Sequence, residues 1–318
     1  MKLPCPSLTA WSFGASCQNK PMKITANNIQ IEIEDSAPGA SHLPVVLLIM
    51  GLGMQLVAWP PGLVRGLVNA GFRVVRFDNR DIGLSEKFHH LGLPNMLWLG
   101  LKYKLGLTVA SPYSLRDMAC DTVGVLDALK IDRAHLVGLS MGGMVAQRVA
   151  LLAPDRCLSL TSIMSSSSAR GLPAAKPAVT RLLLSRPADK SLDAAIAHSV
   201  KVFKAIGGPA FPIDDEDRRT AVAYSLKRSR YWHGILRQMT AILADHRRAD
   251  QLASIKLPTL VVHGKADPLV PYACGEDTAR RIPGAKLVGI DGMGHDLPPG
   301  VVERLLPLLT AHMQATHT

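Results

Sequence analysis

Residues 134–152 read AHLVGLSMGGMVAQRVALL, and the fold prediction starts from this segment. Its first six residues are mostly apolar, as in a buried β-strand, whereas Met141 to Leu152 follow a helical pattern. Between the two, Gly138-Leu139-Ser140-Met141-Gly142 matches G-x-S-x-G. In a strand–turn–helix segment such a serine is exposed beside the free N–H groups of a helix N-terminus, which stabilise a developing negative charge. We therefore predict that Ser140 is a nucleophile; the alternative is a glycine-rich structural turn.

Strands and helices alternate on both sides of this segment. Further buried strands are expected at residues 44–49, 73–77, 157–164, 259–263 and 286–290, and a strand-like segment at residues 24–35. Helices are expected at residues 63–68, 115–129 and 273–281 and from Val301 onward, with Gly71 ending the first of them. Apolar strands that alternate with helices predict an α/β fold, with a mostly parallel sheet and helices on both faces.

The alternation stops between residues 169 and 251, a stretch richer in helix formers, basic residues and prolines. Such an insertion late in a parallel sheet predicts a helical cap over an active site. The predicted division is an N-terminal tail (1–21), a first part of the core (22–168), the cap (169–251) and a second part of the core (252–318). The tail is interpreted as disordered or as upstream of a true start at Met22. The four serines at 165–168 are interpreted as a flexible hinge.

A serine becomes an effective nucleophile only when a base removes its proton and a carboxylate orients that base. Asp267 follows the strand expected at 259–263, and His295 follows the strand expected at 286–290. Both side chains should therefore lie at the sheet edge where Ser140 lies. The chain order of nucleophile, acid and histidine is also the one that accompanies a G-x-S-x-G turn. We predict a triad of Ser140, Asp267 and His295.

Other polar residues near these strand ends are weaker candidates. Asp291 is the nearest rival to Asp267, and Asp296 is too close to His295 in the chain to orient its ring. His263 ends a strand just before a glycine, which suits a packed or backbone-bonded histidine. No His, Cys and carboxylate spacing indicates a metal site, and Gly51-Leu52-Gly53 lacks the rest of a dinucleotide-binding pattern. We expect neither a metal nor a cofactor.

An acyl-transfer site also needs two preorganised N–H donors for the oxyanion. The backbone N–H of Met141, directly after the nucleophile, is one expected donor. The loop after the strand at 44–49 should supply the second, and we predict the N–H of Leu52 because Gly51 permits a sharp turn before it. Met50 and Gly51 are predicted to line the substrate pocket. A purely structural glycine loop is the alternative.

The formal net charge of +11 is concentrated late in the chain, between residues 218 and 248. These basic residues are not interleaved with aromatic ones, and no nucleic-acid-binding motif is present, so nucleic acid is not an expected partner. We interpret them as a solvated helical face; an anionic substrate or a membrane surface is the alternative. No apolar stretch reaches the length of a membrane span, and stable membrane insertion is not expected.

The five cysteines are scattered, and their number is odd. A disulfide framework is therefore improbable, and buried, unreactive thiols are the expected state. The start of the chain lacks the continuous apolar region of a cleaved signal peptide. Together these features favour a cytoplasmic location. The sequence does not indicate an oligomeric state.

Five segments together resemble the α/β-hydrolase superfamily, in particular carboxylesterases similar to aclacinomycin methylesterase. They are Met50-Gly51-Leu52-Gly53, Asp78-Asn79-Arg80-Asp81-Ile82-Gly83-Leu84-Ser85, Gly138-Leu139-Ser140-Met141-Gly142-Gly143, His263-Gly264-Lys265-Ala266-Asp267-Pro268-Leu269-Val270-Pro271 and Gly292-Met293-Gly294-His295. The resemblance spans about residues 22–310. It implies the same triad and an acyl-serine intermediate that water hydrolyses. Many relatives have His-Gly where this chain has Met50-Gly51, which makes the expected pocket wall more apolar.

The expected activity is hydrolysis of a small, hydrophobic carboxylic ester. Thioester, carbon–carbon bond, perhydrolase or lyase chemistry on the same triad stays open, as does a non-catalytic ligand-binding protein. The segment 78–85 is interpreted as a structural loop that supports the site. Apolar residues at 91–101 are expected to pack beneath the cap, with an acyl channel or lipid contact as the alternative. Because the cap is expected to enclose a pocket and no interfacial anchor is evident, short-to-medium acyl chains are expected.

Overall fold

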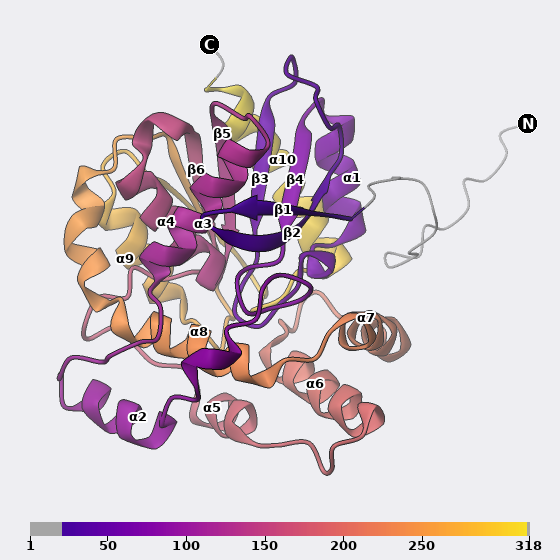
Figure 1. Ribbon diagram of the computed structural model, residues 1–318, viewed down its shortest axis with the longest axis vertical. Helices are drawn as coiled ribbons and strands as arrows, with labels where there is room; N and C mark the ends of the chain where they lie inside the picture. Colours follow the sequence, from indigo (N-terminus) through magenta and orange to yellow (C-terminus); the bar gives the residue numbers. More distant parts are fainter. Residues whose placement is uncertain (1–20, 317–318) are drawn as a thin grey trace, which may run out of the picture.

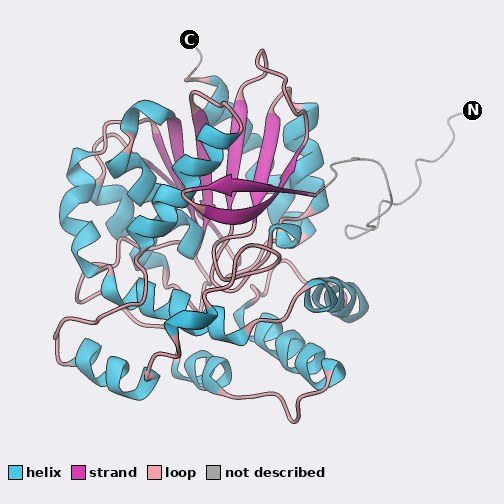
Figure 2. Cartoon of the chain, viewed as in Figure 1, coloured by secondary structure: helices cyan, strands magenta, loops and turns pink. Residues whose placement is uncertain are grey.

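The computed structural model describes residues 21–316, and its central sheet has the strand order β1-β2-β4-β3-β5-β6-β7-β8 (Figures 1 and 2). The strands are β1 (Met22–Ala26), β2 (Ile29–Asp35), β3 (Val45–Ile49), β4 (Arg73–Phe77), β5 (Ala134–Leu139), β6 (Cys157–Ile163), β7 (Thr259–Gly264) and β8 (Lys286–Ile290). Only the β1–β2 and β2–β4 pairs are antiparallel. The predicted α/β class with a mostly parallel sheet is confirmed.

The segment expected as one strand at residues 24–35 is a hairpin. β1 and β2 pair across a turn at Asn27 and Asn28, whose φ angles are 50° and 63°. Two consecutive residues with positive φ form the type of tight turn that joins antiparallel strands, and asparagine tolerates this conformation. The apolar alternation changes register at the turn, from Ile24 and Ala26 to Ile29 and Ile31, and the prediction of one strand-like segment did not take this change into account.

Helices cover both faces of the sheet, as the sequence pattern predicted. They are η1 (Leu56–Ala58), α1 (Pro61–Asn69), η2 (His89–Leu91), α2 (Met96–Lys104), α3 (Leu115–Ala128), α4 (Met141–Leu152), η3 (Pro154–Arg156), α5 (Pro177–Leu184), α6 (Leu192–Ile206), α7 (Asp215–Arg228), α8 (Trp232–Ala244), η4 (His246–Ser254), α9 (Tyr272–Arg281) and α10 (Pro299–Gln314). Gly71, with φ of 90°, follows α1 as expected.

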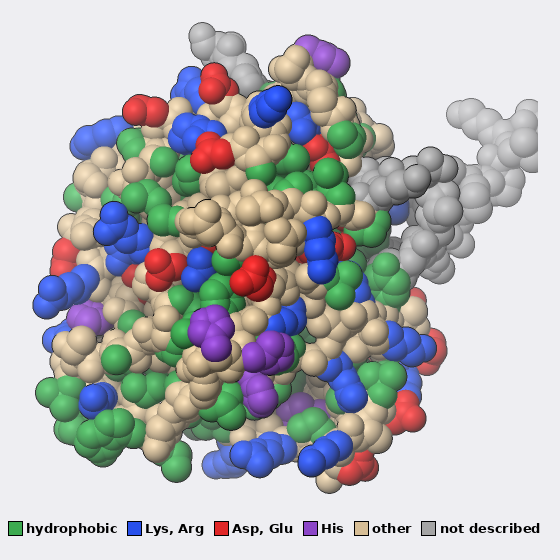
Figure 3. All heavy atoms as spheres, in the orientation of Figure 1, with side chains coloured by type: hydrophobic (Ala, Val, Ile, Leu, Met, Phe, Trp, Pro, Cys, Tyr) green, Lys and Arg blue, Asp and Glu red, His purple; other side chains and the backbone are tan. Residues whose placement is uncertain are grey.

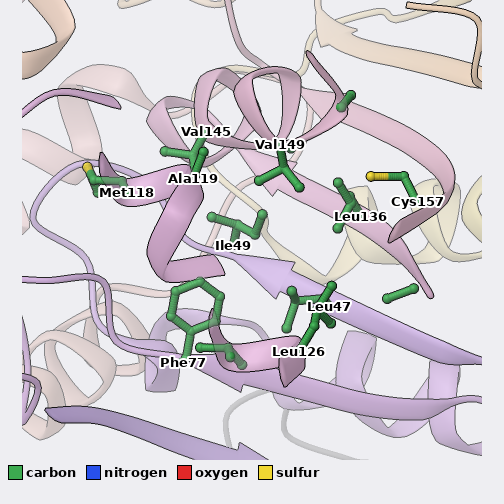
Figure 4. Close-up of a cluster of buried hydrophobic side chains, with 14 of the residues drawn as sticks. Leu47, Ile49, Phe77, Met118, Ala119, Leu126, Leu136, Val145, Val149 and Cys157 are labelled. Carbon is green, nitrogen blue, oxygen red and sulfur yellow. The ribbon is translucent and has the colours of Figure 1, made fainter. Parts of the chain in front are cut away.

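Side chains of β3 divide between two hydrophobic clusters. Leu47 and Ile49 belong to a cluster on the face covered by α3 and α4 (Figure 4), whereas Val46 and Leu48 belong to the cluster under α1 and α10. Neighbouring residues of a strand point to opposite faces, so a strand that is apolar at every position is buried on both. This burial holds the carboxyl ends of the parallel strands, where the site lies, in a rigid frame.

Helices α5 to α8 intervene between β6 and β7, in the interval where the strand–helix alternation stops. They lie at the lower end of the molecule in Figure 1, and they contact loops that follow the strands. The backbone N–H of His295 donates to the carbonyl of Ile206 in α6 at 2.7 Å. Helix η4 spans the proposed boundary at residue 251, so the exact limits 169–251 stay a prediction. The proposed tail lies almost entirely outside the described residues.

Several arginines of this region are buried, which corrects their interpretation as a solvated face. Arg237 is 1% exposed and forms an ion pair with Asp81 at 2.7 Å. Arg248 is fully buried and donates to the side chain of Gln147 at 2.9 Å. An arginine can be buried when a distant segment of the chain supplies an acid or another hydrogen-bond partner. The spacing of residues in the sequence does not reveal such a partner.

Three serines of the run, Ser165, Ser166 and Ser167, are buried too. Ser165 donates to the carbonyl of Ser140 at 2.6 Å, and Ser167 donates to the carboxylate of Asp277 at 2.5 Å. Buried and hydrogen-bonded serines do not form the exposed, flexible hinge that their composition suggested. Cys120, Cys157 and Cys274 are free thiols, and burial raises the pKa of Cys157 to about 12 and that of Cys274 to about 11.

Candidate active site

Ser140 lies between the end of β5 and the first residue of α4, with φ of 54° and ψ of −119°. This conformation is costly for a residue with a side chain and persists only where the surroundings enforce it. A Cβ on Gly138 would overlap with the backbone of Gly142, and a Cβ on Gly142 would overlap with the carbonyl of Ile49. The two glycines of the motif are therefore required by close packing, as predicted for a strand–turn–helix segment.

Three predicted side chains form a continuous chain of hydrogen bonds. His295 Nε2 lies 3.0 Å from Ser140 Oγ, and His295 Nδ1 lies 2.7 Å from Asp267 Oδ2. Asp267 is 6% exposed and His295 is 9% exposed, while Ser140 is half-buried. With Nδ1 protonated toward the carboxylate, Nε2 is left to accept the serine proton.

The second oxygen of Asp267 has its own partners. Oδ1 accepts hydrogen bonds from the backbone N–H groups of Leu269 and Val270, both at 2.8 Å. These bonds come from the turn that follows β7, which holds the carboxylate in one orientation. Oδ2 is thereby directed at His295.

The alternatives to the triad residues, Asp291, His263 and Asp296, have other partners. Asp291 is exposed and pairs with Lys265 at 2.9 Å. His263 is buried, and its Nε2 lies 2.8 Å from the carbonyl of Val270, so that it is backbone-bonded as expected. Burial lowers the pKa of His263, which favours the neutral ring. Asp296 is buried beside Arg218 at 3.8 Å, pointing to a partner other than His295.

The glycine loop after β3 borders the serine. A Cβ on Gly51 would lie 3.3 Å from the Cβ of Ser140 and 3.8 Å from its Oγ. Within the described part of the chain, the backbone N–H groups of Leu52 and Met141 have no hydrogen-bond partner. Met50 is 1% exposed and packs in the cluster with Trp59, so its side chain offers no surface to a substrate. This corrects Met50 as a pocket-lining side chain.

Two residues of the region between β6 and β7 hold this loop, and sequence reasoning did not identify them. Gln238, fully buried in α8, accepts from the N–H of Gly53 at 3.0 Å and donates to the carbonyl of Arg80 at 2.9 Å. Arg228 of α7 donates to the side chain of Gln55 at 2.8 Å. The loop is thus clamped between Ser140 on one side and α7 and α8 on the other. A glutamine and an arginine within helices carry no sequence signal for such a role.

The segment 78–85 supports the same loop. Asp78 is fully buried, accepts from the N–H of Leu56 at 2.7 Å and pairs with Arg228 at 2.6 Å. Asn79 donates from Nδ2 to the carbonyl of Met50 at 2.9 Å. These contacts agree with the interpretation of the segment as structural support.

One buried acid next to the histidine has a displaced pKa. Burial raises the pKa of Asp296 to about 6, although Arg218 and the backbone N–H of Gly208 act in the opposite direction. Its Oδ1 has no hydrogen-bond partner among the described residues. Within residues 21–316, no group of three or more His, Cys, Asp or Glu side chains is arranged to hold a metal ion.

Comparisons with known proteins identify the family of the fold. Residues 44–298 match the family model described as the alpha/beta hydrolase fold. The chain is 29% identical over 290 residues to rhodomycin D methylesterase DnrP of Streptomyces peucetius, and 30% identical over 292 residues to rhodomycin D methylesterase DauP of Streptomyces sp. (strain C5). Each alignment covers 85% of this chain and 91% of the relative. A meta-cleavage product hydrolase from Pseudomonas fluorescens IP01 superposes with a TM-score of 0.70 at 18% identity, covering 92% of this chain and 97% of that one.

Proposed function

Because this chain belongs to the α/β-hydrolase fold family and is a hydrolase of that fold, we propose that it cleaves carboxylic esters through an acyl-serine intermediate on Ser140. The observation that carries the proposal is the hydrogen-bonded chain from Ser140 Oγ through His295 to Asp267, with distances of 3.0 and 2.7 Å. A lone serine hydroxyl is a weak nucleophile, and this arrangement is the one that activates it.

In the proposed acylation step, Ser140 Oγ attacks the ester carbonyl carbon while His295 Nε2 takes the serine proton. Asp267 stabilises the imidazolium that forms but keeps its own charge. The tetrahedral intermediate collapses when the bond to the alkoxy group breaks and His295 returns the proton to the leaving alcohol. A water molecule, deprotonated by the same histidine, then attacks the acyl-serine and releases the acid.

The negative oxygen of each tetrahedral intermediate needs donors that are already oriented. We assign this role to the unpaired backbone N–H groups of Leu52 and Met141. Met141 lies at the N-terminus of α4, where the helix dipole adds to its N–H. Removal of one such donor from an acyl-transfer site costs on the order of 10²–10³ in kcat.

The two methylesterases support a narrower substrate class. Their names state that they act on the methyl ester of rhodomycin D. Leu139 directly precedes Ser140, Leu52 directly follows Gly51, and both apolar side chains are only partly buried. We therefore propose that the substrate is the ester of a hydrophobic acid with a small alcohol such as methanol.

Turnover of soluble p-nitrophenyl esters of graded acyl length, followed by methyl esters of the same acids, tests this function. Ser140→Ala should lower kcat by on the order of 10⁴-fold or more. Ser254→Ala, which removes an exposed hydroxyl of η4, is the matched control and should leave kcat unchanged. Equal turnover by wild type and Ser140→Ala would exclude the proposed mechanism.

A further inference from the structure

Helix α2 and the residues around it expose an apolar surface, whereas the sequence pattern placed residues 91–101 beneath the cap. Leu97 is 89% exposed, Trp98 is 54% exposed and Leu105 is 64% exposed. Leu93, Leu101, Tyr103 and Leu107 are also exposed. Among the side chains of the helix that the structure describes, only Leu99 is buried, while Met96 contacts Thr240 of α8. We call this surface, formed by the exposed residues between 93 and 107, the α2 face.

The α2 face is larger than the scattered apolar residues of an ordinary protein surface. Leu97, Leu101 and Leu105 are four residues apart, so they line one side of the helix. In Figure 3, hydrophobic side chains gather at the lower left, the position of α2 in Figure 1. Exposed apolar patches of this kind mark a binding surface for a protein, a ligand or a membrane.

The charged residues of the neighbouring segments indicate which of these three partners fits. Residues 87–116 contain no Asp or Glu, and neither do residues 156–188. The two segments carry nine Lys and Arg residues in total, namely Lys87, Lys102, Lys104, Arg116, Arg156, Arg170, Lys176, Arg181 and Arg186. Arg170 donates to the carbonyl of Gly106 at 2.9 Å, which joins the two acid-free segments directly beside the α2 face.

An apolar face with Lys102 and Arg170 beside it fits an anionic surface with an apolar interior. Lys102 Nζ lies 5.5 Å from the centre of the Trp98 ring, so a cation and an amphipathic aromatic group are presented together. Tryptophan and tyrosine prefer the level of lipid headgroups, where one end of the side chain is apolar and the other is wet. A second copy of this chain fits less well, because a symmetric contact would bring Lys102 and Arg170 of both copies together.

We propose that the α2 face docks on a bilayer that contains anionic phospholipid, with the leucines and Trp98 inserted at the headgroup boundary and the bordering Lys and Arg residues on the lipid phosphates. No helix within residues 21–316 is long and apolar enough to cross a membrane, so docking is peripheral and reversible. Because α2 packs on α8, which holds the loop beside Ser140, docking brings the candidate site to the membrane surface. The expectation of short-to-medium acyl chains rested on a cap that encloses a pocket and on the lack of an interfacial anchor; docking through the α2 face would supply such an anchor.

Co-sedimentation of the full chain with vesicles tests the docking. Wild type should bind vesicles of phosphatidylglycerol and phosphatidylcholine, bind phosphatidylcholine alone at least about tenfold more weakly, and dissociate as salt is raised. Leu97→Glu and, separately, Leu101→Glu should each weaken binding about tenfold or more. Leu152→Glu makes the same change at an exposed leucine at the end of α4 and should bind like wild type.

The readout is binding, so Ser140→Ala should also bind like wild type, and failure of the ester hydrolysis proposal would leave this result unaffected. Equal binding by Leu97→Glu and Leu152→Glu, or no preference for anionic vesicles, would overturn the proposal. A wild-type dimer that Leu97→Glu dissociates, without vesicle binding by wild type, would overturn it in favour of contact between two copies.

Discussion

The two carboxylate oxygens of Asp267 have different partners, and these partners distinguish Asp267 from the other acids near the site. Oδ1 is occupied by the N–H groups of Leu269 and Val270, while Oδ2 reaches His295 at 2.7 Å. Asp291, by contrast, is exposed and paired with Lys265. The hydrogen bonds within the turn after β7 therefore make Asp267, and not Asp291, the acid that orients His295.

Asp267→Asn should lower kcat by on the order of 10³–10⁴-fold, because an amide neither holds the reactive imidazole tautomer nor stabilises the imidazolium. Asp291→Asn is the control and should change kcat by less than about twofold, since a surface ion pair contributes little. Steady-state kinetics on one soluble ester compares the two. Similar losses in both variants would contradict the assignment of Asp267.

A second residue near the histidine affects stability. Burial raises the pKa of Asp296 to about 6, although Arg218 acts in the opposite direction. Burial of this side chain therefore costs less free energy when the acid is protonated than when it is charged. A group with a raised pKa binds more protons in the folded state. It stabilises the fold fully below its ordinary pKa, and this contribution is lost as the pH rises through about 6.

Asp296→Asn, which mimics the protonated acid, should therefore raise the free energy of unfolding by about 1 kcal/mol at neutral pH. The gain should shrink toward zero as the pH falls to about 4, where the wild-type acid is itself protonated. Urea unfolding at several pH values measures the difference, with Asp291→Asn as the exposed control. A variant that is less stable than wild type at neutral pH would show that the ion pair with Arg218 outweighs burial.

At the scale of elements, helix α8 connects the region between β6 and β7 to the proposed oxyanion loop. The side chain of Gln238 hydrogen-bonds to the backbone of both Gly53 and Arg80. Ile235 of the same helix lies so close to Gly53 that a Cβ there would crowd it. The N–H of Leu52 is next to this contact in the chain. A shift of α8 should therefore move the donor relative to Ser140.

Gln238→Leu keeps the size of the side chain but removes both hydrogen bonds. We expect kcat to fall about tenfold with little change in KM, because the donor acts on charge that develops in the transition state. Gln251→Leu, on η4, removes an exposed glutamine side chain and is the matched control. If the two variants had equal kcat, Gln238 would have no positioning role.

Element by element, the sequence predicted what depends on local pattern. The parallel strands and the positions of Ser140, Asp267 and His295 follow from apolar runs and from turns at strand ends. The hairpin at Asn27 and Asn28 was not predicted, although the apolar alternation changes register there, from Ile24 and Ala26 to Ile29 and Ile31. The burial of Arg237 and the exposure of Leu97 escaped for another reason: both depend on which distant segment faces the residue, and periodicity carries no information on that.

At the scale of the whole molecule, residues 169–251 remain a proposed mobile cap. Helices α5 and α6 bury only Val179, Ile196 and Ile206, whereas the sheet is buried on both faces. Segments with few buried contacts open first. Lys190 is exposed in the connection between α5 and α6.

Brief treatment with trypsin should therefore cut the described part of the chain first after Lys190, as mass spectrometry of the fragments would detect. Arg133, directly before β5, serves as the internal comparison and should be cut only after global unfolding. First cleavage after Arg133 would show that the proposed division into core and cap is wrong.

The central claim is that Ser140 is a nucleophile activated by His295. It is tested most directly by treating the protein with an organophosphonate ester and locating the adduct by mass spectrometry. The account predicts one modified peptide, containing Ser140, in wild type, and its absence in Ser140→Ala and in His295→Ala. An unmodified Ser140 peptide in wild type, or equal modification in His295→Ala, would contradict it.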